Sequence, residues 1–377
     1  MMAHIQKLGP HRYKVKYRDY SKKSRSKTFK KKIDADRFKT HIENELNNGS
    51  WIAPERGRLN FGHYAEIWLS TLDVKPSTIA NYRSILSKHI LPALGNTEVS
   101  KIRWATIEDF KSDLVKSGLN PKTVRNILSV VGPVLTTAVR DGSIATNPAR
   151  EVAKPRITSI REIRPASAHD ILTLTAQMND HDRLLVTFAA FTGLRAGECG
   201  GLQVGDIDFP GRKINVRRSV SEAGGQVQFT SPKNGKSRAV PVPPFLLKQL
   251  ATHLAALGVS DDLNAQVFRS SRGDTYRHSN FYKRVFAPAI KAAGMDGFWF
   301  HHLRHTYASL LIKEGAHPKV IMDRMGHSSI QITMNTYGHL FPSEDEATIT
   351  GLENAFQEAV SNARGPVGGL TMFSRTA

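Results

Sequence analysis

The stretch from residue 298 to residue 337 holds several side chains that could act on a phosphate. His301 and Arg304 are three positions apart, so a helix would place them on one face. His327 follows a glycine, and Tyr337 lies ten positions further along the chain. Arginine and histidine N–H groups bind phosphate oxygens, and a tyrosine hydroxyl can serve as a nucleophile. These residues favour chemistry on a phosphodiester.

Two stretches upstream add further cations. Arg195 lies in the run FTGLRAGE at residues 191–198, which is compatible with a helix. Arg195 and Arg304 could bind both non-bridging oxygens of a phosphate, because a guanidinium presents a planar fork of donors. Lys233 lies between two expected strands, on a hairpin where a lysine could protonate a departing 5′ oxygen. Lys236, three positions on, competes for this role.

Each of these side chains also has an ordinary structural explanation. Tyrosines usually pack by their rings, and most histidines make a structural hydrogen bond. A lysine in a turn is commonly solvated. Arg195 could form a salt bridge with Glu198, three positions away on a helix, although such an acid can also orient an arginine that binds phosphate. The functional interpretation therefore depends on the combination of residues.

Metal binding is the main competing chemistry for the histidines. His301 and His305 are four positions apart, a spacing that suits two zinc ligands on one helix. No acid lies between them as in the zinc-protease motif, and Arg304 would repel a cation. We therefore expect no metal site. We also expect no nucleotide cofactor, because the chain has neither GxxxxGKS nor GxxxxGKT.

These stretches, in this order, resemble the tyrosine recombinases, and among them the phage-type, lambda-integrase-like integrases. The resemblance covers nearly the whole chain. It rests on FTGLRAGE, on HHLRHT from His301, on MGHSS around His327 and on TMNTY ending at Tyr337. It implies that Tyr337 is the nucleophile. The implied catalytic set is Arg195, Lys233, His301, Arg304, His327 and Tyr337.

The resemblance also ranks the alternatives. Lys233 is preferred over Lys236 because it follows the run TSP and precedes the strand RAVP, where the family places its catalytic lysine. His302 occupies a position that is often acidic or polar in relatives, so His301 is the better match for the functional histidine. Two further side chains are expected in supporting roles, Glu198 and His305.

The composition favours a nucleic-acid partner. The 377 residues carry 53 Lys and Arg against 33 Asp and Glu, a net charge of +20 with a pI near 10.0. Such a surplus attracts a polyanion, with nucleic acid ahead of an anionic membrane surface. We expect neither a membrane span nor a secretory leader, and a cytoplasmic location on the DNA of a bacterial host. The single cysteine, Cys199, excludes an internal disulfide and a multi-cysteine zinc site.

The length predicts two or three domains, the first at residues 1–55. Residues 1–40 hold 14 Lys and Arg and only three Asp. Apolar residues from Tyr13 to Tyr17 alternate with basic ones, as in a strand with one apolar and one basic face. Residues 24–29 can return as a second strand, and an amphipathic helix follows.

A small sheet with a basic face can lie in a DNA groove, as two-stranded ribbons do. A solvated basic tail and a nuclear-targeting patch are the alternatives. The layout resembles the arm-site-binding domain of lambda-type integrases, which implies a second class of DNA site. The candidate DNA-binding residues are Arg12, Lys14, Lys16, Arg18, Lys22, Lys23, Arg25 and Lys27.

The rest of the chain divides into a helical part and a mixed part. The apolar pattern of residues 60–150 predicts an all-α domain of four helices, which resembles the family's core-binding domain. Taken alone, this pattern fits an ordinary helical domain better. Pro133 predicts a kink or break in the fourth helix. Residues 151–165 read as a linker. A mainly helical catalytic domain with a small antiparallel sheet is expected at 166–345, and a final helix with a mobile tail at 346–377.

The sequence therefore predicts a multidomain protein. It comprises a small β-sheet with a helix, an all-α core-binding domain and the mixed, mainly α catalytic fold of the tyrosine recombinases. The resemblance implies a site-specific integrase that cuts and rejoins DNA through a 3′-phosphotyrosyl intermediate. A type IB topoisomerase shares this chemistry, and a non-catalytic DNA-binding regulator fits the charge equally well. The N-terminal and helical domains argue against the first, and the full catalytic set against the second.

The resemblance also implies partners. These are double-stranded DNA with core-type and arm-type attachment sites, and three further copies of the chain in a tetramer on DNA. A host DNA-bending protein and a directionality factor are further candidates. In relatives a C-terminal segment packs against a neighbouring protomer, whereas packing within the chain is the alternative here.

Overall fold

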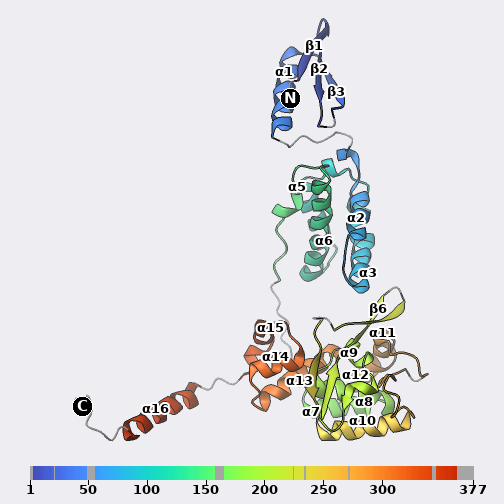
Figure 1. Cartoon of the computed structure of the whole chain (residues 1–377), viewed down its shortest axis with the longest axis vertical. Helices are drawn as coiled ribbons and strands as arrows, with labels where there is room; N and C mark the ends of the chain where they lie inside the picture. The colour runs from blue at the N-terminus through green and yellow to red at the C-terminus, as the bar shows by residue number, and fades with distance from the viewer. Residues whose placement is uncertain are drawn as a thin grey trace. The chain divides into compact units, whose positions relative to one another are not determined.

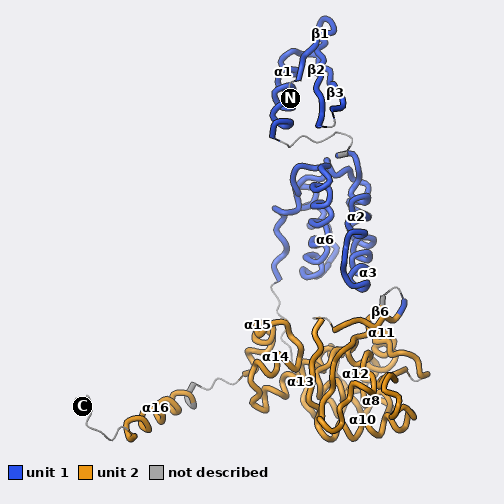
Figure 2. The backbone as a smooth tube through the Cα atoms, in the orientation of Figure 1, with its two compact units in different colours: residues 1–162, 223–226 blue, residues 163–222, 227–377 orange. Residues whose placement is uncertain are grey.

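The computed structural model describes residues 3–20, 22–48, 56–157, 165–223, 225–232, 235–270, 272–341 and 345–362. The chain forms two compact units (Figure 2). The first comprises residues 1–162 and 223–226, and the second comprises residues 163–222 and 227–377. The first unit contains two separate hydrophobic clusters, one in its N-terminal part and one in its helical part, and the second unit contains a larger one.

The N-terminal part is a three-stranded antiparallel sheet with one helix packed on it (Figure 1). The strand order is β1–β2–β3. The alternation in β2 buries Val15 and Tyr17 against the helix, as the sequence predicts. The first strand was not expected, because Ile5 is its one partly buried large apolar side chain. The elements are β1 His4–Gly9, β2 Arg12–Arg18, β3 Ser24–Phe29 and α1 Lys32–Asn47.

The helical part has the four long helices that its apolar periodicity predicts, α2, α3, α5 and α6. A π-helical turn and the short helix α4 lie between α3 and α5. Its elements are α2 Phe61–Ser70, α3 Pro76–Ile85, the turn Leu86–Ile90, α4 Leu91–Leu94, α5 Trp104–Lys116 and α6 Pro121–Arg140. The side chain of Asn120 caps α6 by accepting the N–H of Lys122 at 2.9 Å, and Pro121 occupies the first turn.

Of the kink or break expected at Pro133, the break does not occur, because α6 continues through this residue to Arg140. Eight apolar residues of α6 are buried in the helical core, and this packing outweighs the loss of one backbone hydrogen bond. The Asn147 amide also donates to the carbonyl oxygen of Gly132 at 2.8 Å, so the backbone beside the proline is partnered.

The second unit is a helical body with two small sheets (Figure 1). Its strands are β4 Ile207–Asp208, β5 Lys213–Val216, β6 Ser219–Ala223, β7 Gln226–Thr230 and β8 Arg238–Pro241. Its first helices are α7 Ala168–Ala176, α8 Asp180–Thr192, α9 Ala196–Gly200 and α10 Pro244–Ala256. The later helices are α11 His278–Phe281, α12 Ala287–Ala292, α13 Phe300–Lys313, α14 Pro318–Met325, α15 Ile330–Tyr337 and α16 Asp345–Asn362.

Residues 213–220 contribute to two strands that lie in different sheets. Strand β5 pairs with β4 and β8, whereas β6 forms a hairpin with β7. The chain turns at Arg218, whose Nη2 donates to the buried carboxylate of Asp206 at 2.9 Å. Strand β6 then runs so close to α9 that a Cβ on Gly197 would lie 2.4 Å from the carbonyl oxygen of Val220.

The last helix, α16, follows the pattern that its sequence predicts but exposes its apolar side chains. Ile349, Leu352, Phe356 and Val360 are all among the exposed large hydrophobic residues. Among the described residues, no helix is both long enough and apolar enough to cross a membrane.

Candidate active site

Glu198 lies between two arginines at the start of α9 and is only 2% exposed. Its Oε1 accepts Nη1 of Arg195 at 2.9 Å and Nη1 of Arg238 at 3.0 Å, and its Oε2 accepts Nη2 of Arg238 at 2.7 Å. Burial alone would raise the pKa of Glu198, but the hydrogen bonds and charge of Arg238, then those of Arg195, outweigh it and lower the pKa to about 2. The ionised carboxylate therefore fixes Arg195.

Arg238 is a positioning residue that the sequence interpretation missed. Its Nε donates to the carbonyl oxygen of Arg324 at 2.8 Å, near the end of α14, while its other nitrogens hold Glu198. One side chain thus connects strand β8 to both α9 and α14. In the sequence, the run RAVP indicates only the position of the lysine hairpin.

Arg304 is buried on α13, with 2% of its surface exposed. Its Nη1 donates to the carbonyl oxygen of Gly193 at 2.7 Å, and its Nη2 donates to that of Met325. Both carbonyls lie at C-terminal ends of helices, α8 and α14, where the helix dipole favours a cation. Burial first, then the charges of Arg195 and Arg238, lower the pKa of Arg304 to about 9, so the guanidinium remains charged at neutral pH.

Tyr337 ends α15, is 1% exposed and belongs to the hydrophobic core of the second unit. Its hydroxyl lies 2.7 Å from Nδ1 of His305. Burial raises the pKa of Tyr337 to about 12, although Arg304 and Arg195 oppose this shift. The hydroxyl is therefore protonated at neutral pH, and a nucleophilic attack by this oxygen requires a group that removes its proton.

His305 lies in the second turn of α13, and its Nδ1 contacts the hydroxyl oxygen of Tyr337, the candidate nucleophile. Burial, with His301, His302 and Arg304 next in order, lowers the pKa of His305 to about 3. The imidazole is therefore neutral at physiological pH. The family resemblance implies only a supporting role for His305. Its contact with Tyr337 joins residues 32 positions apart, so sequence patterns do not predict it.

His327 follows Gly326, whose left-handed conformation (φ +62°) ends α14. Its Nδ1 lies 2.8 Å from Oγ1 of the buried Thr333, and its ring stacks on Tyr337 with centroids 6.4 Å apart. Burial first, then Arg304 and Arg195, lower the pKa of His327 to about 4. A neutral imidazole held in this way suits hydrogen bonding to an oxygen.

The two histidines at the start of α13 differ in what they do. Nδ1 of His302 accepts the backbone N–H of Trp299 at 3.2 Å, so His302 caps the helix. His301 is exposed, and its ring meets that of His305 at 90° with centroids 5.1 Å apart. The geometry therefore favours His301 over His302 as the histidine that faces a substrate.

Lys233, the expected leaving-group acid, lies outside the described residues. Its competitor Lys236 is exposed and follows Gly235, which has a φ of +67°. Among the described residues, no group of three or more His, Cys, Asp or Glu side chains is arranged to hold a metal ion. The structure brings the other members of the predicted set into one region of the second unit, joined by the interactions above: Arg195, His301, Arg304, His327 and Tyr337.

The sheet register divides the candidate DNA-binding residues of the N-terminal part. On β2, Lys14 pairs with Thr28 and Lys16 with Ser26, on the face away from α1. Arg25 and Lys27 stand opposite the buried Tyr17 and Val15, on the face that α1 covers. The basic face of β2, defined here as Arg12, Lys14, Lys16 and Arg18, therefore excludes Arg25 and Lys27.

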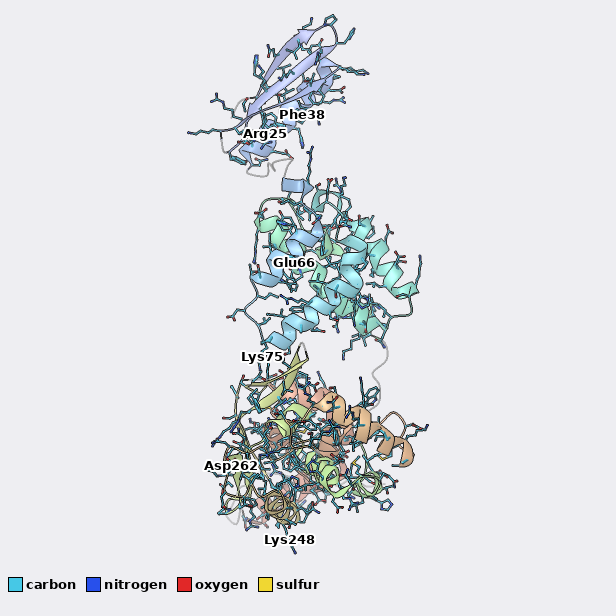
Figure 3. All side chains as sticks on the ribbon, turned by 90° about the vertical axis from the view of Figure 1, so that its right-hand side faces the viewer. Arg25, Phe38, Glu66, Lys75, Lys248 and Asp262 are labelled. Carbon is cyan, nitrogen blue, oxygen red and sulfur yellow. The ribbon has the colours of Figure 1, made fainter. Side chains whose placement is uncertain are left out.

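The contacts of these two residues are structural. Nε of Arg25, labelled in Figure 3, donates to the buried carboxylate of Asp19 at 2.7 Å, which closes the β2–β3 turn. Nζ of Lys27 lies 4.9 Å from the ring centre of Phe38 on α1. In the same turn, Lys22 and Lys23 are exposed, and Lys22 has a φ of +60°.

Comparison with known proteins identifies the family. A family description, "Phage integrase family", matches residues 163–344, and another, "Phage integrase, N-terminal SAM-like domain", matches residues 60–115. The putative prophage phiRv2 integrase of Mycobacterium tuberculosis is 32% identical over 329 residues, which cover 85% of this chain and 86% of that protein. The chain belongs to the phage integrase family. It is a tyrosine-type site-specific DNA recombinase, and neither the topoisomerase nor the regulator alternative is favoured.

Two solved structures share the fold of this recombinase. The Tn1549 transposon integrase in complex with a circular intermediate DNA matches with a TM-score of 0.66 at 18% identity, over 78% of this chain and 99% of that one. A lambda integrase tetramer bound to a Holliday junction matches with a TM-score of 0.58 at 20% identity, over 86% and 97%. The expected multidomain recombinase fold is thus confirmed.

Proposed function

We propose that Tyr337 attacks a DNA phosphate and forms a 3′-phosphotyrosyl link, which a 5′ hydroxyl from the partner duplex later reverses. The observation that carries this proposal is the buried Tyr337 hydroxyl beside His305, in a region that also holds Arg195 and Arg304. The link conserves the energy of the phosphodiester, so the reaction needs no nucleotide cofactor.

The remaining roles follow from charge and position. Arg195 and Arg304 neutralise the non-bridging oxygens, because both guanidinium groups are fixed by buried partners. His327 donates to one of these oxygens, and the exposed His301 faces the DNA. Lys233 protonates the departing 5′ oxygen, with Lys236 as the alternative.

We further propose that the recombinase acts as a homotetramer on paired attachment sites. Two rounds of strand exchange use four nucleophiles, and the lambda integrase tetramer on a Holliday junction shares this fold. The exposed apolar side chains of α16, Ile349, Leu352, Phe356 and Val360, supply a surface that a neighbouring copy can bury. Packing of α16 within its own chain is the alternative.

The parts of the chain have different DNA contacts in this proposal. The second unit and the helical part hold the core-type site, and the basic face of β2 holds an arm-type site. A host DNA-bending protein brings the two kinds of site together, and a directionality factor selects integration or excision. The reaction takes place on DNA in the cytoplasm of a bacterial host.

Recombination between two plasmids that carry candidate attachment sites tests this function. Wild-type protein should give a joint product that depends on both sites and on Tyr337, with none from Tyr337→Phe. Lys233→Ala should lose far more activity than Lys236→Ala. Relaxation of supercoiled plasmid without an attachment site, and with no joint product, would contradict the proposal.

A further inference from the structure

We propose that His305, rather than the more exposed His301, takes the proton from the Tyr337 hydroxyl as this oxygen attacks the phosphate. This inference rests on the proposed role of Tyr337 as nucleophile. It changes His305 from a supporting side chain on α13 into the general base of the cleavage step.

The first argument is contact. A general base must lie within hydrogen-bond distance of the proton that it removes. Nδ1 of His305 is 2.7 Å from the hydroxyl oxygen of Tyr337, and the two rings meet edge to face with centroids 5.6 Å apart. Among the described residues, the structure records no other hydrogen bond to this hydroxyl.

The second argument is access. Tyr337 is almost fully buried, so water is not positioned to remove its proton. His305 is half-buried and has His301 on its other side, with the two rings perpendicular and their centroids 5.1 Å apart. His301 in turn is exposed. The side chains therefore follow the order Tyr337, His305, His301 from the core to the surface, and His305 is the first acceptor.

The third argument is electrostatic. Burial is the main cause of the low pKa of His305 of about 3, followed by the neighbouring His301, His302 and Arg304. A neutral imidazole with an acceptor nitrogen can take a proton, but in this environment it is a weak base. A DNA phosphate bound by Arg195 and Arg304 brings a negative charge that offsets the charges of these guanidinium groups and raises the basicity of His305. The base therefore becomes effective only when DNA is present, which protects Tyr337 from reacting without a substrate.

The step balances without any co-reactant. The O–H bond of Tyr337 breaks and its proton moves to Nδ1 of His305, while the tyrosine oxygen forms a bond to phosphorus. The bond from phosphorus to the 5′ oxygen breaks, and that oxygen takes a proton from the leaving-group acid, Lys233 in the proposed function. In the joining step the imidazolium of His305 returns its proton to the tyrosine oxygen.

His305→Asn separates proton transfer from positioning. An asparagine amide can occupy the place of Nδ1 and hydrogen-bond to Tyr337, but it cannot accept the proton. We expect single-turnover cleavage of nicked attachment-site DNA to fall by about 100-fold or more, with DNA affinity unchanged. His302→Asn is the matched control, because it removes a neighbouring imidazole that caps the helix, and its cleavage rate should stay within about threefold of wild type.

Two chemical substitutions distinguish the base from the acid. A fluorinated tyrosine at position 337 ionises more easily, so it should restore part of the rate that His305→Asn loses. A 5′-bridging phosphorothiolate needs no leaving-group acid, so it should rescue Lys233→Ala but not His305→Asn. Thermal unfolding of each variant verifies folding, and His305→Gln replaces His305→Asn if the latter does not fold.

Cleavage by His305→Asn within about threefold of wild type would overturn the inference. Rescue of this variant by the phosphorothiolate would also overturn it, because His305 would then act on the leaving group. The parent proposal fails separately: a DNA-linked band that persists in Tyr337→Phe would remove Tyr337 as nucleophile, whatever His305 does.

Discussion

Arg238 and Glu198 form a bidentate ion pair, with nitrogen–oxygen distances of 2.7 and 3.0 Å. The same carboxylate holds Arg195 at 2.9 Å, so one buried anion organises two cations from separate parts of the chain. The pair compensates part of the positive charge that the site concentrates for a phosphate. This relationship makes the arrangement of Arg195 dependent on strand β8, because Arg238 lies 40 positions after Glu198.

Replacing Glu198 with glutamine should reduce both stability and cleavage. Removing one partner of a buried ion pair lowers the free energy of unfolding by about 3 kcal/mol. Arg195 also loses the carboxylate that holds it in position. The pKa of Glu198 is lowered from 4.5 to about 2 in the folded protein. Its stabilisation is therefore complete above pH 4.5 and is lost as the pH falls towards 2. Thermal unfolding of wild type and Glu198→Gln should differ strongly at pH 7 and converge in acid.

Glu222→Gln provides the control for this prediction. Glu222 is an exposed acid of β6 that accepts two hydrogen bonds from Ser279, at 3.0 and 2.6 Å, so its replacement should cost less than about 1 kcal/mol. A pH-independent difference between wild type and Glu198→Gln would show that the carboxylate charge does not carry the stabilisation.

Replacing Gly193 with alanine should destabilise the second unit by about 3 kcal/mol. The residue has a φ of +67°, and an added Cβ would lie 2.4 Å from Cδ1 of Tyr307. Backbone strain and overpacking therefore both contribute to the destabilisation. Gly294 has the same φ but nothing within 4 Å of the added Cβ, so Gly294→Ala should cost only about 1 kcal/mol. Equal losses in denaturant unfolding would exclude the predicted clash.

Neutralising the basic face of β2 should weaken binding to arm-type DNA. We expect Lys16→Gln with Arg18→Gln to reduce the slope of log affinity against log salt by about 2, because each cation neutralises one phosphate. Lys32→Gln with Arg37→Gln removes the same charge from α1, on the other side of the sheet, and should change binding little. Similar losses from both pairs, measured by fluorescence anisotropy, would favour a diffuse charge effect.

Acidic substitutions on α16 should impair assembly without affecting folding. Leu352→Glu with Phe356→Glu changes two exposed side chains, so the unfolding temperature should remain the same. Complexes of four protomers on paired sites should become much less abundant in native gels. Asn354→Glu with Gln357→Glu adds the same charge at exposed polar positions and serves as the control. If the first pair of substitutions left assembly unchanged, the apolar side chains of α16 would not lie at the interface between protomers.

Local patterns in the sequence predicted much of the fold. The alternation in β2 and the apolar periodicity of α6 depend on neighbouring residues, so they can be read without a structure. The order of four motifs predicted the recombinase family. Pro133 predicts a kink or a break, and the break does not occur because tertiary packing of α6 outweighs a local preference.

The missed features depend on contacts between distant parts of the chain. Arg238 meets Glu198 across 40 positions, and His305 meets Tyr337 across 32. Periodicity carries no information on such pairs, because each depends on how the helices and strands pack. The sheet register likewise separated Arg25 and Lys27 from the basic face, although all of these residues are close in sequence.

Covalent trapping tests the central claim most directly. Attachment-site DNA with a nick near the cleavage point loses a short fragment after attack, so the enzyme cannot rejoin the strand. We expect wild-type protein to give a DNA-linked band on a denaturing gel and Tyr337→Phe to give none, with equal DNA binding. A band of equal strength from Tyr337→Phe would contradict the account, because the nucleophile would then be another residue.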